Sequence, residues 1–248
     1  MPRRWLLILK MKKESMNRRL TREQAVYVAI PKKEWMNTII TRFDEVGCPL
    51  IPLQETEKPT PLVYEFPYLA LPVILIAYRA SDVGKVVNDP RSREIGGFTG
   101  TDIAIENKLK TIAALPVDDM DRSARVSMGV TMNWQEKVAK PSVQNLPKDS
   151  LVATAYPNMT QSFLKENGVK AQVLPLGGSI EAAAWSYPNC NAVVDVVVSG
   201  DTFLANGVRE LETVLSPITI EALAEPKGTS KEALQVYERL LSIFFTEK

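Results

Sequence analysis

The sequence predicts an α/β fold with largely parallel strands, and the pattern is clearest after residue 150. There, three apolar runs with strand character each lead into a segment with helical character. Such alternation is typical of parallel βαβ units, because a parallel strand needs a long crossover to return to the same end of the sheet. The strand and helix pairs are 151–156 with 157–169, 171–176 with 177–185, and 191–198 with 200–207.

The N-terminal half contains similar units. AVYVAI at 25–30 predicts a strand, and the apolar spacing of EWMNTIITRFDEVG at 34–47 predicts a helix. PVILIAY at 72–78 predicts a second buried strand, followed by a short helix at 81–88. Five prolines between residues 49 and 67 favour a loop and an edge strand, because proline lacks the amide hydrogen that a central strand donates.

Three further elements complete the pattern. Residues 93–108 predict a strand, a glycine-containing turn and the start of a helix, and residues 124–130 predict another strand. The last segment, 229–245, predicts an amphipathic helix. Its expected start is Thr229, because Glu232 stands at the spacing of a capping box.

Composition limits the chemistry that this chain can perform. With 248 residues, 45% of them hydrophobic, and a net charge of +1, it is a globular chain with no electrostatic demand for nucleic acid or a membrane surface. It contains no histidine, which excludes Ser-His-Asp and Cys-His catalysis and histidine-based metal sites. Cys48 and Cys190 lack C-x-x-C spacing, so neither a disulfide framework nor a zinc site is expected.

Residues 1–24 are basic, with eight lysines or arginines against two glutamates. The apolar run at 5–9 is too short for a membrane span, which needs about 20 residues, and for the core of a signal peptide. We expect a flexible tail or an over-long translation start and a cytoplasmic protein. An organellar presequence is less well supported, because such segments are rich in serine and poor in acids.

Three strand–turn–helix junctions are candidates for binding an anion. Glycine-rich backbone lets several N–H groups converge, and the helix that follows adds a partial positive charge. In open α/β sheets, ligands bind at the carboxyl ends of the strands. One such junction is also typical of a purely structural turn, but three favour an anion-binding cleft. The junctions are 96–102, 177–181 and 199–202.

Asp201 places a carboxylate inside the third junction, where it would repel a phosphate. Contact between the two at 4 Å would cost on the order of several kcal/mol at an effective dielectric near 20. If Asp201 turns into the loop, it satisfies the amides itself, as a helix cap worth about 0.5–2 kcal/mol. If it points away, the amides of 199–202 stay open to a phosphate. The sequence leaves both alternatives open.

Six segments match, in order along the chain, the motifs of one known family. They are VAIPK at 28–32, YRASDVGKVV at 78–87, GGFTGTDIAIE at 96–106, LVATAYPNMTQSFLKENGV at 151–169, LPLGGSIEAAAW at 174–185 and AVVDVVVSGDTFLANGVRELE at 192–212. Their residues and their order along the chain resemble the motifs of the ATP phosphoribosyltransferase family, which catalyses the first committed step of histidine biosynthesis. The resemblance runs from about residue 26 to 214 and covers most of the chain.

The resemblance implies two α/β domains with parallel or mixed sheets, of the periplasmic-binding-protein type, with the active site in the cleft between them. We predict that domain I comprises residues 25–114 and 205–248, and that domain II comprises 115–204. The implied activity is that of a glycosyltransferase. It moves the 5-phosphoribosyl group from phosphoribosyl pyrophosphate to N1 of ATP and releases pyrophosphate, with Mg²⁺ carried by the substrate and no protein-bound metal. Because the chain stops soon after the core, it resembles the short family form, which implies a homo-oligomer and a regulatory subunit similar to histidyl-tRNA synthetase.

The resemblance also assigns roles to individual residues. Asp195 and Glu181 are the expected catalytic carboxylates, and Asp195 is expected to hold ribose hydroxyls. The loop at 199–202 is expected to hold the 5′-phosphate. Glu181 and Glu106 also fit a purely structural role as first-turn helix acids. The predicted substrate-binding residues are Lys32, Thr99, Gly100, Asp102, Asn158, Thr160, Gly178, Ser179, Ser199, Gly200, Asp201 and Thr202.

Several positions depart from the family pattern, and some of the departures remove positive charge. Gln161 and Ser162 replace a basic pair, Gly177 replaces an asparagine, and Val198 and Asp201 are unusual in the phosphate loop. They motivate an alternative hypothesis, a catalytically impaired paralogue that acts as a nucleotide-binding or regulatory subunit. A third hypothesis, a binding-protein-like solute receptor, is disfavoured because no export signal precedes the core.

Overall fold

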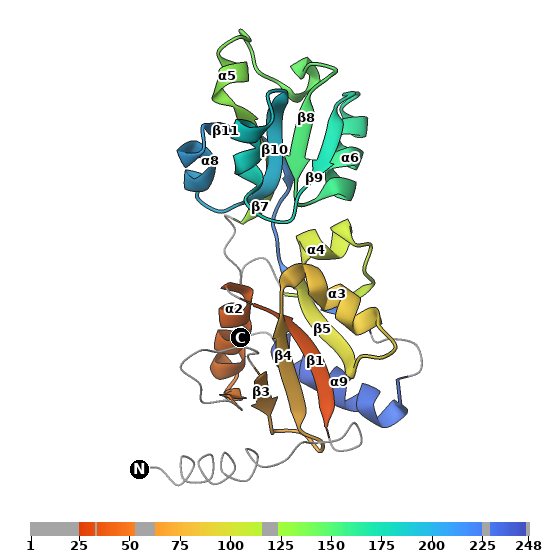
Figure 1. Ribbon diagram of the computed structural model, residues 1–248. Coiled ribbons are helices and arrows are strands. Elements are labelled where there is room, and N and C mark those ends of the chain that lie inside the picture. The colour runs from red at the N-terminus through yellow and green to blue at the C-terminus, as the bar shows by residue number, and fades with distance from the viewer. Residues whose placement is uncertain (1–24, 33, 53–62, 116–123, 225–228, 247–248) are drawn as a thin grey trace. The chain divides into compact units, whose positions relative to one another are not determined.

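The computed structural model describes residues 25–32, 34–52, 63–115, 124–224 and 229–246. They form two compact units (Figure 1). Unit 1 comprises Met1–Ala104, Leu109–Leu115 and Ile220–Lys248, and unit 2 comprises Ile105–Lys108 and Pro116–Thr219, as far as these ranges are described. The predicted tail at 1–24 lies outside the described residues.

Unit 1 is built on a seven-stranded mixed sheet in the order β2-β3-β4-β1-β5-β12-β6. The centre is parallel, since β1 pairs with β4 and β5 in parallel, and the outer strands join antiparallel. All six residues of β1 are buried, which explains its unbroken apolar run in place of an alternating one. The strands are β1 (Val26–Pro31), β2 (Ile51–Pro52), β3 (Val63–Phe66), β4 (Val73–Tyr78), β5 (Glu94–Gly100), β6 (Thr111–Ala114) and β12 (Ile220–Leu223).

The helices of unit 1 are α2 (Glu34–Glu45), α3 (Ala80–Asn88), α4 (Thr101–Glu106), whose last two residues belong to unit 2, and α9 (Lys231–Phe244). The predicted C-terminal helix is confirmed, but it begins one residue later than expected. Its cap is Ser230, whose Oγ accepts a hydrogen bond from Ala233 N at 3.2 Å. The apolar stripe of α9 ends in Phe244, whose ring lies 4.6 Å from that of Phe98 in β5.

Unit 2 has a five-stranded sheet in the order β11-β7-β10-β8-β9. The pairs β10–β8 and β8–β9 are parallel, whereas β7 lies antiparallel to both β10 and β11. The strands are β7 (Arg125–Thr131), β8 (Leu151–Thr154), β9 (Gln172–Pro175), β10 (Cys190–Val197) and β11 (Val208–Leu215). The prediction assigned residues from 205 onward to domain I, but β11 pairs with β7, so residues 205–219 belong to unit 2.

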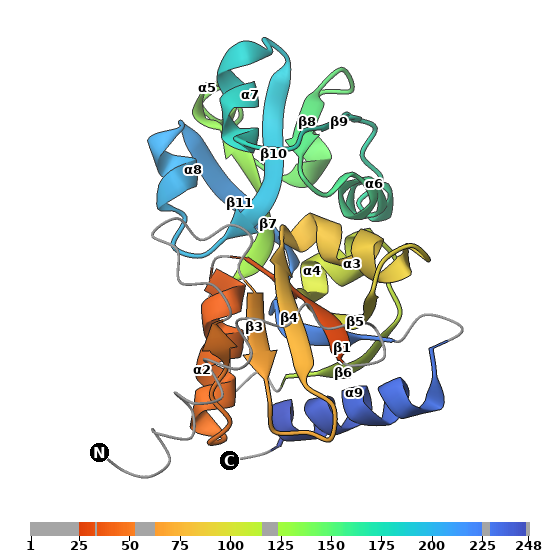
Figure 2. The same cartoon turned by 60° about the horizontal axis from the view of Figure 1, so that its bottom comes forward.

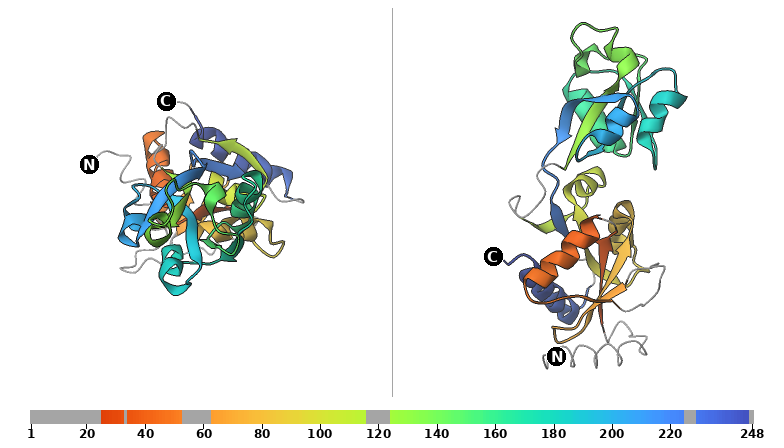
Figure 3. Two further views of the ribbon diagram at one scale, coloured as in Figure 1. Left: turned by 90° about the horizontal axis from the view of Figure 1, so that it is seen from above. Right: turned by 90° about the vertical axis from the view of Figure 1, so that its left-hand side faces the viewer.

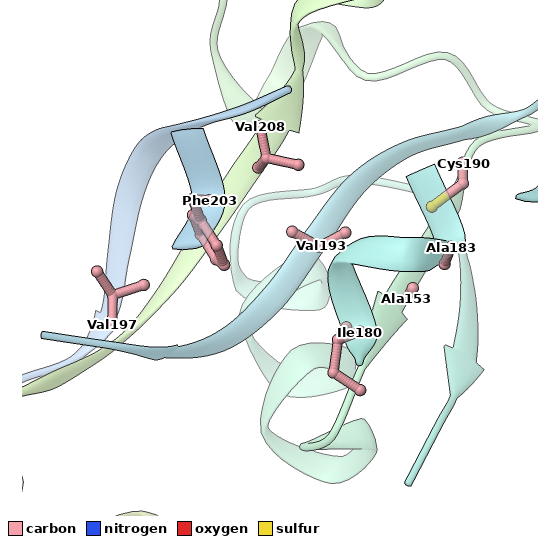
Figure 4. Close-up of a cluster of buried hydrophobic side chains, with 8 residues drawn as sticks. All are labelled: Ala153, Ile180, Ala183, Cys190, Val193, Val197, Phe203 and Val208. Carbon is pink, nitrogen blue, oxygen red and sulfur yellow. The ribbon is translucent and has the colours of Figure 1, made fainter. Parts of the chain in front are cut away.

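Helices cover both faces of the second sheet, as the turned views show (Figures 2 and 3). They are α5 (Met132–Gln135), η2 (Val143–Asn145), α6 (Pro157–Glu166), η3 (Ile180–Ala182), α7 (Ala183–Ser186) and α8 (Asp201–Ala205). One face packs into a core cluster to which η3, α7 and α8 contribute Ile180, Ala183 and Phe203 (Figure 4). Helix α6 contacts the other face, which carries Thr154. In the described part of the chain, no helix has the length and apolar character needed to cross a membrane.

Gly96 in β5 is required by the close approach of α9. A methyl group at this position would overlap the ring of Tyr237, a fully buried residue. The Tyr237 hydroxyl accepts from Gly97 N at 3.1 Å and donates to Leu223 O at 2.8 Å, so the ring cannot move without losing these bonds.

We therefore expect Gly96→Ala to lower the free energy of unfolding by about 1–3 kcal/mol, because overpacking forces a shift of the ring or the strand. Denaturant unfolding monitored by circular dichroism measures the change. Gly177→Ala is the matched control, since a methyl group there meets no atom within 4 Å. Equal stability of the two variants would contradict the prediction.

Candidate functional site

The predicted site residues of unit 2 gather at one edge of its sheet. In the parallel register, Val194 of β10 pairs with Thr154 of β8, which pairs with Pro175 of β9. The segments that follow these strands therefore leave the sheet at the same edge. They carry Asn158, Thr160, Gly178, Ser179, Glu181, Ser199, Gly200, Asp201 and Thr202, and Asp195 lies close to this edge in β10.

The loop between β10 and α8 turns through Gly200, whose φ of +88° is a left-handed conformation that favours glycine. Asp201 N donates to Ser199 Oγ at 3.3 Å. The Asp201 side chain is exposed, and its carboxylate accepts no hydrogen bond from any residue that the structure describes. The sequence left open whether Asp201 turns into the loop or points away from it. In the structure, the Asp201 carboxylate does not close the loop.

Phe203 anchors this loop to the sheet. Its ring is buried and lies between Val197 and Val208 (Figure 4). A methyl group on Gly129 of β7 would come within 2.7 Å of the Phe203 ring, so α8 packs closely on the sheet here. Helix α8 is consequently anchored to the core of unit 2 through Phe203.

Asp195, the predicted ribose ligand, lies on β10 opposite Ser127 of β7. Its side chain is half-buried, and its Oδ1 accepts a hydrogen bond from Val196 N at 2.8 Å. Because Val194 pairs with the last residue of β8, Asp195 stands one residue beyond the end of that strand. This position puts a carboxylate at the sheet edge, close to the loop at 199–202.

Arg125 of β7 contacts the same loop and was not among the predicted site residues. Its Nη1 donates to Val198 O at 3.1 Å, and its Nε donates to Glu210 Oε1 at 2.6 Å. Its Nη2 donates to Glu210 Oε2, and Ser127 Oγ donates to Glu210 Oε1 at 2.7 Å. These hydrogen bonds from Arg125 lower the pKa of Glu210, partial burial opposes the shift, and the Ser127 bond adds to it. The same pair raises the pKa of Arg125.

Helix α6 begins differently from α8, because a protein carboxylate already occupies its amides. Buried Glu106 accepts from Asn158 N and Met159 N, each at 2.9 Å. Asn158 Nδ2 donates to Glu106 O at 3.0 Å. The amides of the first turn of α6 therefore bind a side chain from 52 residues earlier in the chain.

Thr160 was expected to bind substrate, but its side chain is fully buried in this structure. Thr160 Oγ1 lies 2.9 Å from Thr154 Oγ1, a bond that joins α6 to β8. Thr160 thus has a structural partner and is not presented to solvent. Glu106, for which a helix-acid role and a site role were both open, acts as a cap, although for α6 and not for its own helix.

The junction at 177–181 leads into η3 at the same sheet edge. Gly178 and Ser179 are exposed, and Glu181 is half-buried within η3. The Glu181 carboxylate has no hydrogen bond to a described residue. Its place near the start of η3 fits both the predicted site role and a structural role.

Unit 1 holds the remaining predicted residues at the carboxyl ends of β1 and β5. Pro31 of β1 pairs with Tyr78 of β4, so Lys32 and Arg79 both follow parallel strands at one edge. Gly100 ends β5 and leads into α4. Arg79 is exposed and was not among the predicted residues.

Two of the predicted substrate-binding residues in unit 1 are buried. The side chains of Thr99 and Asp102 are buried, and Thr99 Oγ1 has no hydrogen-bond partner among the described residues. Neither side chain is presented to solvent in this structure. In the described ranges, no three residues of the types His, Cys, Asp and Glu cluster so that they could hold a metal ion.

The cap on α6 generates a prediction for stability. Glu106→Gln should lower the free energy of unfolding by roughly 1–3 kcal/mol, because it weakens two charge-assisted bonds of a buried group. Denaturant unfolding measures the loss. The control is Glu166→Gln at the exposed end of the same helix, which we expect to change stability by less than about 0.5 kcal/mol. Equal losses in the two variants would contradict the capping role.

Comparison with known proteins identifies the family. Residues 79–242 match the family model of ATP phosphoribosyltransferase (HisG). An ATP phosphoribosyltransferase from Deinococcus deserti is 30% identical over 187 residues, which cover 75% of this chain and 77% of that protein. One from Methanosarcina barkeri is 26% identical over 220 residues, covering 88% and 68%. One from Cytophaga hutchinsonii is 31% identical over 140 residues, but that alignment spans only 46% of the relative's length.

Solved structures confirm the predicted fold class. An ATP phosphoribosyl transferase (HisG:HisZ) complex from Thermotoga maritima has a TM-score of 0.62 at 21% identity, covering 88% of this chain and 96% of that one. A periplasmic sulfonate-binding protein from Methylobacillus flagellatus has a TM-score of 0.53 at 11% identity, covering 89% and 66%. At these identities the likeness concerns the fold, which is of the periplasmic-binding-protein type. The family model and the relative from Deinococcus deserti show that this chain belongs to the ATP phosphoribosyltransferase family, as its motif order predicted.

Proposed function

We propose that this protein transfers the 5-phosphoribosyl group from phosphoribosyl pyrophosphate to N1 of ATP and releases pyrophosphate. The observation that carries the proposal is the loop at 199–202, which follows β10 at the carboxyl edge of the sheet and is not closed by the Asp201 carboxylate. Membership of the family supports it. The relatives reported above bear the name ATP phosphoribosyltransferase, so the impaired paralogue is not favoured.

The chemistry suits a site without histidine. Displacement of pyrophosphate from the anomeric carbon passes through an oxocarbenium-like state, and the attacking ring nitrogen has a free lone pair, so no strong base is required. Catalysis then depends on positioning and on fixed dipoles around the phosphate. Mg²⁺ enters with the pyrophosphate as part of the substrate, where it balances the charge of the leaving group.

The residues of unit 2 take the donor roles in this proposal. The amides at the start of α8, with the hydroxyls of Ser199 and Thr202, bind the 5′-phosphate. Asp195 accepts hydrogen bonds from the ribose hydroxyls and, as an anion, favours the positive charge that develops on the sugar ring. Phe203 keeps this geometry fixed from within the core.

The acceptor role falls to the carboxyl edge of unit 1. Lys32 and Arg79 supply positive charge for the triphosphate of ATP, and Gly100 lets backbone approach the ligand closely. We further propose a homo-oligomer that assembles with a regulatory chain similar to histidyl-tRNA synthetase. The Thermotoga maritima neighbour supports a partner of this kind, since it is a complex of HisG with HisZ. The need for ATP favours the predicted cytoplasmic location.

Release of pyrophosphate tests the proposed function directly. We expect turnover with phosphoribosyl pyrophosphate, ATP and Mg²⁺, and a loss of roughly 100-fold in kcat/KM for Asp195→Asn, because the variant removes a charge that stabilises the transition state. Glu212→Gln, an exposed carboxylate of β11, is the control and should retain activity. The proposal fails if no purine nucleotide supports turnover, with or without a regulatory chain.

The exposed Asp201 carboxylate next to the proposed phosphate site generates a second prediction. Asp201→Asn should lower the KM for phosphoribosyl pyrophosphate about 3- to 10-fold at low salt, because it removes a like charge near the phosphate. The gain should shrink at high ionic strength, which screens exposed charges. Asp149→Asn, elsewhere on the surface of unit 2, is the control. An unchanged or raised KM at low salt would show that the phosphate does not bind beside Asp201.

A further inference from the structure

We propose that Arg125 is a positioning residue for the phosphate loop, and that the Arg125–Glu210 pair thereby sets the affinity for phosphoribosyl pyrophosphate. The inference rests on the proposed function, because it assigns a role relative to the donor substrate. It concerns Arg125 of β7 and Glu210 of β11, neither of which is among the predicted site residues.

The hydrogen bond from Arg125 Nη1 to Val198 O lies just beyond the last residue pair of β7 and β10. The last paired residues of β10 and β7 are Val197 and Arg125. Val198 is the next residue after β10, so its carbonyl lies beyond that last pair. The Arg125 side chain binds this carbonyl at 3.1 Å and so extends the support of β10 up to Ser199.

Glu210 and Ser127 fix the direction of the guanidinium. The Glu210 carboxylate binds Nε and Nη2 together, a fork geometry that leaves Nη1 pointing to the loop. The hydroxyl of fully buried Ser127 holds the same carboxylate at 2.7 Å. A lysine has a single ammonium group, so it cannot bind both carboxylate oxygens and the carbonyl in this fixed geometry.

The charge balance distinguishes positioning from direct binding of phosphate. The charge of Arg125 is already paired with that of Glu210. If Arg125 were a phosphate ligand held in reserve, Glu210→Gln would release it and strengthen binding of the donor. If Arg125 acts through the Val198 carbonyl, Glu210→Gln loosens the guanidinium and weakens binding. The two roles therefore predict opposite signs for the same variant.

The first measurement is hydrogen–deuterium exchange on the full chain without substrate. In Arg125→Lys and in Glu210→Gln, the hydrogen-bonded amides within residues 199–204, those of Asp201 and Leu204, should exchange roughly tenfold faster, because a charge-assisted bond to the loop is weakened. Arg209→Gln is the matched control, since Arg209 is an exposed arginine of β11 without an ion pair in the described structure. Unfolding curves establish that each variant is folded.

The second measurement separates the two substrates. The KM for phosphoribosyl pyrophosphate should rise roughly tenfold in Arg125→Lys and in Glu210→Gln, while the KM for ATP stays within about twofold. The double variant Arg125→Lys/Glu210→Gln should resemble the single variants, because both act on one contact and their effects are not additive.

The outcomes decide the proposal. Faster exchange at 199–204 with an unchanged KM for the donor would reduce the network to a structural role, and unchanged exchange would remove the positioning effect itself. Tighter donor binding in Glu210→Gln would overturn positioning in favour of direct contact. If the unsubstituted protein releases no pyrophosphate with any purine nucleotide, with or without a regulatory chain, the proposed function fails. Exchange together with calorimetric binding of phosphoribosyl pyrophosphate then still determines whether Arg125 positions the loop.

Discussion

The parallel pairing of β8 with β9 and β10 is the constraint on which the candidate site depends. Because the three strands run in one direction, the segments that follow them leave the sheet at the same edge. A side chain from β10 and three different turns thus lie at one edge of the sheet, without any histidine to gather them. Strand β7 runs antiparallel to β10, so its first residue, Arg125, lies at this edge and contributes through its side chain.

The free amides at a helix start can bind either a protein carboxylate or a phosphate. In unit 2, the starts of α6 and α8 differ in this respect. At α6, Glu106 is buried and receives the two free amides of the first turn, so this start is closed. At α8, the Asp201 carboxylate is exposed and makes no such bond to a described residue. The same physical preference of amides for anions stabilises the fold at one helix and supports the proposed phosphate site at the other.

Polar contacts between residues far apart in the sequence fix the geometry of unit 2. The Arg125–Glu210 pair joins residues 85 positions apart, and Glu106 reaches α6 across 52 positions. Each of these groups is partly or fully buried, so an unpaired charge would be costly and the geometry is fixed by complete pairing. Phe203 packs into the core beneath the loop, and Arg125 donates a hydrogen bond to Val198 O at the start of the loop.

The sequence by itself determined the alternation of strands and helices, the turn at Gly200 and the family, because these depend on local patterns and on motif order. It also predicted the apolar stripe of α9 but placed the cap at Thr229, where the choice between adjacent hydroxyls is decided by local backbone geometry. Only the tertiary structure decided that β11 joins the second sheet, that Thr160 is buried, and that Glu106 and Arg125 bind distant backbone. These outcomes depend on strand register and on contacts between residues far apart in the chain, which periodicity along the sequence does not encode.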